Sequence, residues 1–166
     1  MTISHTTIGS PVGELTLVAD EGGLTGIYFT EHIRRPPASD FGARDGDGFA
    51  EVERQLGEYF AGSRKSFDLR LNPHGDDFQK KVWMLLRGIP YGQTRSYGAL
   101  AVELGDPNLA RAVGAANGKN PLSIVVPCHR VVGADGRLTG YAGGLERKAF
   151  LLELEESPEV KAGKLF

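Results

Sequence analysis

The chain is poor in cysteine: its 166 residues include only one, Cys128. A single thiol excludes an internal disulfide and any metal site built from several cysteines. The four histidines, His5, His32, His74 and His129, are scattered without the paired spacing that zinc ligands show. We therefore expect no bound metal. Cys128 is left with two possible roles, a buried apolar side chain or a nucleophile.

Long hydrophobic runs are also absent. No apolar stretch approaches the roughly 20 residues that a membrane-spanning helix needs. Residues 1–5 lack the basic and then apolar pattern of a secretion signal. Together with the single cysteine, these features favour a protein of the reducing cytoplasm. The length suits one compact domain, or a small module that rests on a larger one.

The chain has little net charge, −2, but the charge is unevenly distributed. Residues 1–69 hold six Lys or Arg against eleven Asp or Glu, whereas residues 80–149 hold ten against four. A basic section of this kind could bind a polyanion through salt-sensitive phosphate contacts. A solvated surface of mixed charge explains the same counts, and charge alone does not decide between the two.

The first part of the chain has the pattern of a small β-rich module. Residues 15–19 and 24–29 read as two strands of a hairpin, and residues 66–71 alternate like a third strand. Residues 49–60 show helical spacing of apolar side chains. Residues 31–48 are rich in Pro, Gly, Arg and Asp and predict an exposed, mobile loop. Nothing in this module suggests chemistry.

From residue 76 onward the pattern is helical. Asp76 or Asp77 can cap a first helix that ends at Gly88, and Ser96 can cap a second that ends at Gly105. Asp106 and Pro107 supply the cap and first position of a third helix. The tight turn between the second and third helices indicates a helix-turn-helix.

A last helix is predicted over residues 145–156. Its expected inward-facing residues are Ala149, Phe150, Leu151 and Leu154.

The third helix, residues 108–117, consists mainly of Ala and Gly with one long side chain, Arg111. Reading bases in the major groove usually needs several long polar side chains. A thin helix with small residues suits the narrow minor groove instead. A helix packed tightly in a core would have the same composition, so the helix alone leaves both interpretations open.

The neighbours of Cys128 favour the nucleophile. An apolar run ends at Pro127, which should break the strand, and His129 and Arg130 could stabilise a thiolate. Adjacent side chains of a strand point to opposite faces, so contact with His129 requires a turn or a bridging water. A carboxylate should orient the imidazole. The last helix offers three: Glu153, Glu155 and Glu156.

Two other cysteine chemistries fit poorly. Papain-like enzymes bring their histidine from a distant segment. A phosphatase loop would have arginine six positions after the cysteine, where this chain has Ala134.

The ordered motifs around Cys128 resemble those of the O6-alkylguanine-DNA alkyltransferases. The similarity is strong over residues 78–156, and residues 1–70 match mainly in layout. The residues that carry it are Phe78-Gln79, Pro90-Tyr91-Gly92, Ser96-Tyr97, Arg111-Ala112-Val113-Gly114, Asn117-Gly118, Asn120-Pro121, Pro127-Cys128-His129-Arg130, Gly140-Tyr141-Ala142-Gly143-Gly144 and Leu151-Leu152. The resemblance implies an α/β (α+β) fold, with a ribonuclease-H-like β module over 1–72 and a helix-turn-helix domain over 73–166.

The resemblance also implies the reaction. Cys128 would accept the alkyl group of O6-alkylguanine, or of O4-alkylthymine, from double-stranded DNA in one irreversible step. His129 would act through a water as the base, held by Glu155. No cofactor is expected, and the cysteines that hold zinc in some relatives are missing here.

Further roles follow from the same resemblance. Arg111 would replace the flipped base in the DNA stack, with Ala110, Gly114 and Asn117 beside it. Tyr97 would help to rotate the nucleotide and donate a hydrogen bond to guanine N3. Asn120 would tie the recognition helix to the cysteine loop.

The base pocket would be bordered by Tyr141, Ala142 and the carbonyls of Cys128 and Val131. We expect a monomer, with cooperative binding along DNA left open. The alternatives are a non-catalytic alkyltransferase-like protein that binds damage, a group that lacks the acceptor cysteine, and a transcription regulator using the same helix-turn-helix.

Overall fold

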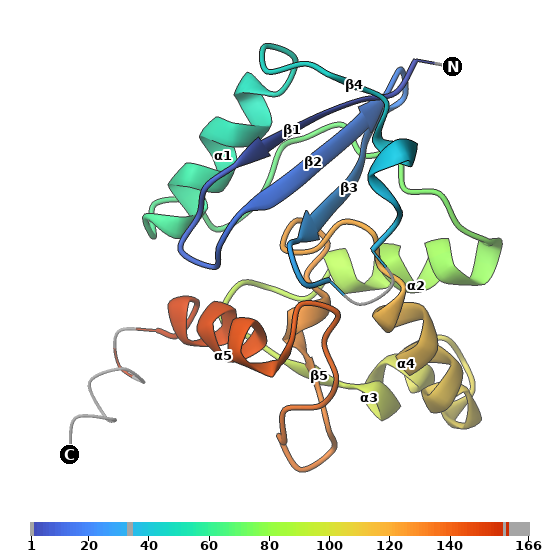
Figure 1. The fold of residues 1–166 in the computed structure, drawn as a ribbon. Coiled ribbons are helices and arrows are strands. Elements are labelled where there is room, and N and C mark those ends of the chain that lie inside the picture. The colour runs from blue at the N-terminus through green and yellow to red at the C-terminus, as the bar shows by residue number, and fades with distance from the viewer. Residues whose placement is uncertain (1, 33–34, 158, 160–166) are drawn as a thin grey trace.

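The computed structural model describes residues 2–32, 35–157 and 159 (Figure 1). Its first part is a four-stranded sheet in the order β3-β2-β1-β4. Strands β1 (Ser4–Ile8), β2 (Leu15–Asp20) and β3 (Gly23–Phe29) form an antiparallel meander, and β4 (Ala43–Arg44) pairs in parallel with β1. Helix α1 (Ala50–Phe60) lies beside this sheet (Figure 1). The predicted hairpin and the predicted helix are therefore confirmed.

One prediction for this first part was wrong, and another was confirmed only in part. Residues 66–71 form no strand, because only Leu71 makes a bridge, to Leu24. Their alternation reflects packing instead: Phe67, Leu69 and Leu71 lie against the core. Residues 42–48 are exposed as predicted, but the described part of 31–48 also includes a 3₁₀ helix, Ala38–Phe41, and strand β4, which the predicted loop lacked.

The predicted helices of the second part are confirmed, with small shifts at their ends. They are α2 (Asp77–Arg87), α3 (Tyr97–Glu103), α4 (Ala110–Gly118) and α5 (Leu145–Leu154). Asp76 forms a capping box with Gln79, and the Ser96 hydroxyl accepts from the Ala99 backbone. Asp106 caps a 3₁₀ turn, Pro107–Leu109, that leads into α4.

The predicted inner face of α5 was wrong at one position. Phe150 is 38% exposed, whereas Lys148, in the first turn of the helix, is fully buried. The apolar pattern of the sequence could not show this, because a lysine is buried only where its ammonium group finds acceptors.

One continuous hydrophobic core joins the sheet to the helices. The Ile27 backbone N–H donates to the Pro121 carbonyl oxygen at 2.8 Å, which ties β3 to the segment before Cys128. Trp83 is 3% exposed and donates from Nε1 to the carbonyl of Ala116, which holds α2 to α4. The short strands β5 (Arg95–Ser96) and β6 (Val131–Val132) pair in parallel and place the start of α3 beside the cysteine loop.

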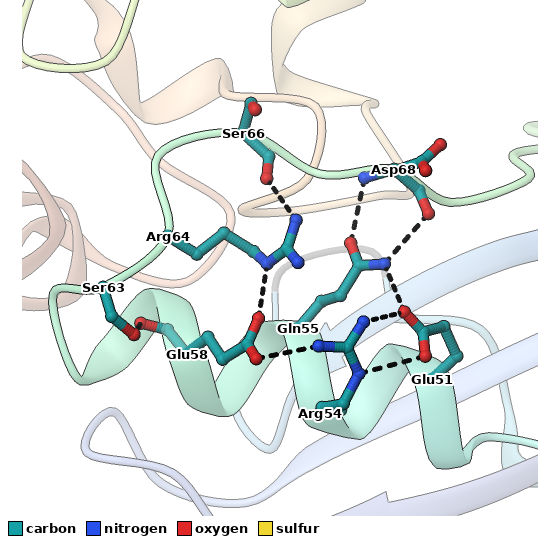
Figure 2. A network of polar contacts seen from close by, with 8 residues as sticks. All are labelled: Glu51, Arg54, Gln55, Glu58, Ser63, Arg64, Ser66 and Asp68. Atoms are coloured by element: carbon teal, nitrogen blue, oxygen red, sulfur yellow. Dashed lines mark hydrogen bonds and ion pairs between the residues drawn. The ribbon is translucent and has the colours of Figure 1, made fainter.

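A polar network fixes the segment after α1 onto that helix (Figure 2). Gln55 donates from Nε2 to the Asp68 carbonyl and accepts from the Asp68 N–H, both at 2.9 Å. Glu58 accepts from Arg54 and Arg64, both at 2.8 Å. The network holds residues 63–68 in place without the strand that the sequence predicted.

Over the part of the chain that the structure describes, every helix is too short or too polar to cross a membrane.

The capping box of α2 gives the first testable prediction. Asp76→Ala should lower the free energy of unfolding by about 1 kcal/mol, because it leaves the Gln79 N–H of the first turn without an acceptor. Asp77→Asn serves as the control, since Asp77 lies in the same turn but is not the capping residue. Chemical denaturation of both variants measures the difference, and equal stability of the two would contradict the capping role.

Candidate active site

Cys128 begins a 3₁₀ turn, Cys128–Arg130, directly after Pro127. The strand predicted to end at Pro127 was wrong, because residues 123–126 form turns and a bend. The turn places Cys128, His129 and Arg130 in the interior, and Cys128 is 3% exposed. Just before it, Ile124 adopts a φ of 76°, which is a costly conformation for a β-branched residue. The surrounding core must hold this loop in one shape.

Asn120 braces the same loop. Its Nδ2 donates to the Val126 carbonyl at 2.8 Å, and its Oδ1 accepts from the Leu122 N–H at 3.0 Å. The side chain is 2% exposed. Asn120 therefore lies where the resemblance expected a link between α4 and the cysteine loop.

Glu155, at the end of α5, is the centre of a buried polar cluster. Its Oε2 accepts from His129 Nε2 at 2.7 Å, and Arg130 grips both oxygens, from Nε at 2.7 Å and from Nη2 at 3.0 Å. Tyr59 of α1 donates from its hydroxyl to the same Oε2. Of the three candidate carboxylates on the last helix, Glu155 is the one that meets His129.

This cluster sets the protonation of His129. Burial acts to raise the pKa of Glu155, but the hydrogen bonds and charges of His129 and Arg130 outweigh it and hold the pKa at about 2. The carboxylate can therefore only accept. Burial lowers the pKa of His129 below its usual value. A neutral imidazole then carries its proton on Nε2, which leaves Nδ1 as a basic nitrogen. No described protein group bonds to Nδ1.

The prediction that His129 and Arg130 stabilise Cys128 as a thiolate was wrong for the protein without DNA. Burial raises the pKa of Cys128 to about 11, and the side chain of Asn120 and the charge of Lys148 only partly oppose this. Arg130 does not supply the expected positive field, because its guanidinium is taken up by Glu155 and by the Ile89 carbonyl. The thiol is protonated at neutral pH and needs a base to react.

A pocket of about 340 Å³ lies between α3, α4 and the loop before α5. Its lining includes five expected site residues: Tyr97, Gly114, Asn117, Tyr141 and Ala142. Asn117 connects the pocket to the cysteine loop, since its Nδ2 lies 3.5 Å from the Cys128 carbonyl oxygen. A Cβ on Gly114 would lie 3.6 Å from the Tyr97 ring, so a small residue keeps α4 close to that ring.

Lys148 is a site residue that sequence reasoning missed. Its buried Nζ donates to the Val131 carbonyl at 2.6 Å and to the Thr139 carbonyl at 2.9 Å. Thr139 in turn bonds through its hydroxyl to the Tyr97 hydroxyl at 2.7 Å. Burial lowers the pKa of Lys148 to about 8. The lysine fastens both ends of the loop 132–138 beside the pocket. It also occupies one acceptor site of the Val131 carbonyl oxygen, which was expected to border the pocket for the flipped guanine.

The remaining expected residues lie on α4. Arg111 is exposed near the start of this helix, and Ala110 is half-buried beside it. The structure thus groups the expected residues in two sets. One is the buried set around Cys128, and the other is the surface of α4 next to the pocket. Within the described residues, no group of three or more His, Cys, Asp or Glu could hold a metal ion.

Comparison with known proteins agrees with this arrangement. Residues 77–157 match the family model of the 6-O-methylguanine DNA methyltransferase DNA binding domain, and residues 3–73 match its ribonuclease-like domain. The methylated-DNA–protein-cysteine methyltransferase of Methanosarcina acetivorans is 51% identical, covering 89% of this chain and 95% of that protein. That of Mycolicibacterium paratuberculosis is 49% identical and covers 99% of both chains.

The chain is also similar to a solved structure, in both fold and sequence. The crystal structure of Mycobacterium tuberculosis OGT in complex with DNA has a TM-score of 0.86 and 50% sequence identity, covering 92% of both chains. Fold and site together define a two-part α/β protein built around one buried cysteine. The chain belongs to the 6-O-methylguanine DNA methyltransferase family.

The Glu155 cluster predicts a pH dependence of stability. A carboxyl whose pKa falls from 4.5 to about 2 on folding stabilises the protein above pH 4.5, and this contribution is lost as the pH falls toward 2. The loss should be up to about 3 kcal/mol. Urea denaturation between pH 5 and pH 2 should show a shallower dependence for Glu155→Gln than for the natural protein. Parallel curves would contradict the assigned pKa.

Proposed function

We propose that this protein repairs alkylated DNA directly, by moving the alkyl group from O6 of guanine to Sγ of Cys128. It is then a methylated-DNA–[protein]-cysteine S-methyltransferase that acts on duplex DNA, with O4-alkylthymine as a second substrate. The observation that carries the proposal is the buried series of Cys128, His129 and Glu155 behind a pocket next to a helix of small residues. Hydrogen bonds and burial, with no cofactor, supply what the transfer needs.

The transfer itself is one displacement. His129 Nδ1 takes the proton of Cys128 through a bridging water, and Glu155 stabilises the imidazolium that forms. The sulfur then attacks the alkyl carbon, an S–C bond forms, and the C–O6 bond breaks. The electron pair of the broken bond passes into the guanine ring, where Tyr97 donates a hydrogen bond to N3. The proton that His129 took from the thiol is finally transferred to the guanine.

The DNA step uses the helix-turn-helix of α3 and α4. A base atom inside a duplex is out of reach, so the alkylated nucleotide must be rotated out of the stack. Arg111, which is exposed, fills the space that the base leaves, while the small residues of α4 allow close approach to the minor groove. Asn117, Tyr141, Ala142 and the carbonyls of Cys128 and Val131 then surround the base.

The reaction ends with a thioether, which is a poor leaving group. Cys128 is the only cysteine of the chain, so no second thiol can remove the alkyl group. Each molecule therefore reacts once. The same cysteine argues against a damage-binding protein without transfer activity.

We further propose a division at residues 72 and 73 into the two expected units, 1–72 and 73–166. We also propose that the protein works in the cytoplasm as a monomer. The shared core and the contact between Tyr59 and Glu155 favour two units that act together.

Stoichiometry tests the proposed function. With a duplex oligonucleotide carrying O6-methylguanine, the peptide containing Cys128 should gain one methyl group, and repaired DNA should never exceed the protein present. Mass spectrometry and chromatography of the DNA measure both. Cys128→Ala should bind the DNA and transfer nothing. Repeated turnovers, or a methyl group on another residue, would contradict the proposal.

Arg111 provides a test of base flipping. Arg111→Ala should slow transfer from duplex DNA by about tenfold or more, because the energy of unstacking, a few kcal/mol, is no longer offset. Transfer from the same lesion in single-stranded DNA should fall much less. Arg44→Ala is the charge-matched control, since Arg44 is exposed and its strand β4 lies away from α3 and α4 (Figure 1). Equal losses on both DNA substrates would argue against a flipping role.

A further inference from the structure

The polar cluster around Cys128 includes one member from the first part of the chain. Tyr59 lies on α1, 96 positions before Glu155, and donates its hydroxyl proton to Glu155 Oε2. His129 Nε2 bonds to the same oxygen. The first part of the chain, which the sequence analysis regarded as free of chemistry, thus touches the carboxylate that orients the base.

Tyr59 can only be a donor in this contact. Its side chain is fully buried, and burial together with the negative charge of Glu155 raises the pKa of the phenol far above its usual value. The hydroxyl therefore keeps its proton at any physiological pH. Glu155, in contrast, stays ionised and has only acceptors to offer.

The packing around Tyr59 holds its ring in one place. The rings of Phe60, Phe67 and Tyr91 surround it, with centroids 5.3, 5.4 and 6.3 Å away. Phe67 belongs to the segment that Gln55 and Arg64 fasten onto α1 (Figure 2). A hydroxyl on a ring this constrained is a fixed point from which a carboxylate can be positioned.

We propose that Tyr59 is a positioning residue for the alkyl transfer, in which its hydroxyl fixes the Glu155 carboxylate so that Oε2 stays in line with His129 Nε2. Arg130 donates to both carboxylate oxygens, and Tyr59 supplies a further donor to Oε2, the oxygen that His129 also contacts. Without that hydroxyl, the carboxylate can tilt toward Arg130 and away from the imidazole. The inference rests on the proposed function of Cys128 and His129.

The test is Tyr59→Phe, which keeps the ring and removes one oxygen atom. The rate constant of methyl transfer at saturating duplex DNA should fall about tenfold, because the buried Glu155 carboxylate loses one hydrogen bond that holds it toward His129. The affinity for DNA should not change. Single-turnover kinetics reports only the folded molecules, since unfolded protein lowers the amplitude and leaves the rate constant unaffected. A rate constant equal to that of the natural protein would overturn the proposal.

Tyr91→Phe is the matched control. Tyr91 belongs to the same aromatic cluster, but its hydroxyl donates to the Leu154 carbonyl, at 3.3 Å. This variant should transfer at close to the natural rate. An equal loss in both variants would reduce Tyr59 to a packing residue.

A double-mutant cycle locates the effect. If Tyr59 acts through Glu155, then Tyr59→Phe should cost little further in a Glu155→Gln background, because contacting residues are not additive. The acid side of the pH–rate profile should also move in Tyr59→Phe, since Glu155, Arg130 and Lys148 are the charged groups that act on His129 and only the hold on Glu155 changes. Full additivity with an unmoved profile would overturn the proposal.

A DNA-independent reaction separates this proposal from the proposed function. With His129 as the base, the rate at which iodoacetamide alkylates Cys128 near neutral pH should also depend on proton transfer to His129. Tyr59→Phe should slow this reaction relative to Tyr91→Phe. If the natural protein failed to repair DNA but this difference held, the proposed function would fail and the role of Tyr59 would stand. Equal iodoacetamide rates would overturn the role of Tyr59 even where DNA repair succeeds.

Discussion

The structure around the cysteine depends on one buried negative charge, the carboxylate of Glu155. A buried carboxylate without partners would be very unfavourable, and it persists here because three side chains donate to it. One donor, Tyr59, comes from α1, and the other two, His129 and Arg130, come from the turn after Pro127. The same contacts that make the charge tolerable also fix the positions of His129 and Arg130. Stability and chemistry thus share one group.

This arrangement explains why the resting cysteine is not a thiolate. Arg130 is the nearest permanent positive charge in sequence, but its guanidinium satisfies Glu155 and a backbone carbonyl. Burial then dominates and holds the proton on the sulfur. A thiol of this kind reacts slowly with chance electrophiles, since the thiolate is the nucleophile. In the proposed mechanism the thiol becomes reactive when His129, whose Nδ1 has no partner among the described protein groups, removes the proton beside a bound substrate.

Features that depend on neighbouring residues could be predicted from the sequence. The capping box at Asp76 and the hairpin of β2 and β3 each follow from a few adjacent side chains. The motifs around Cys128 were also local enough to indicate the family. The strand expected at 66–71 failed because alternation shows which residues face the core, whereas pairing requires a partner edge that the sequence does not reveal.

The contacts that complete the site are long-range and gave no local signal. Lys148 looked like a solvent-facing residue of α5, since nothing near it in sequence shows that two carbonyls await its ammonium group. Tyr59 fitted the apolar face of α1, and its hydroxyl meets Glu155 only because the two parts of the chain share a core. The roles of Lys148 and Tyr59 become visible only in the folded structure, where polar atoms on otherwise apolar helix faces meet distant partners.

The central claim is that burial keeps His129 neutral while Glu155 fixes its proton on Nε2, which leaves Nδ1 basic. Nuclear magnetic resonance of the protein labelled with ¹⁵N in its histidines measures this directly through the two ring nitrogen shifts. The account predicts a protonated Nε2 and an unprotonated Nδ1 for His129 at neutral pH. An Nδ1–H tautomer, or an imidazolium at that pH, would contradict it.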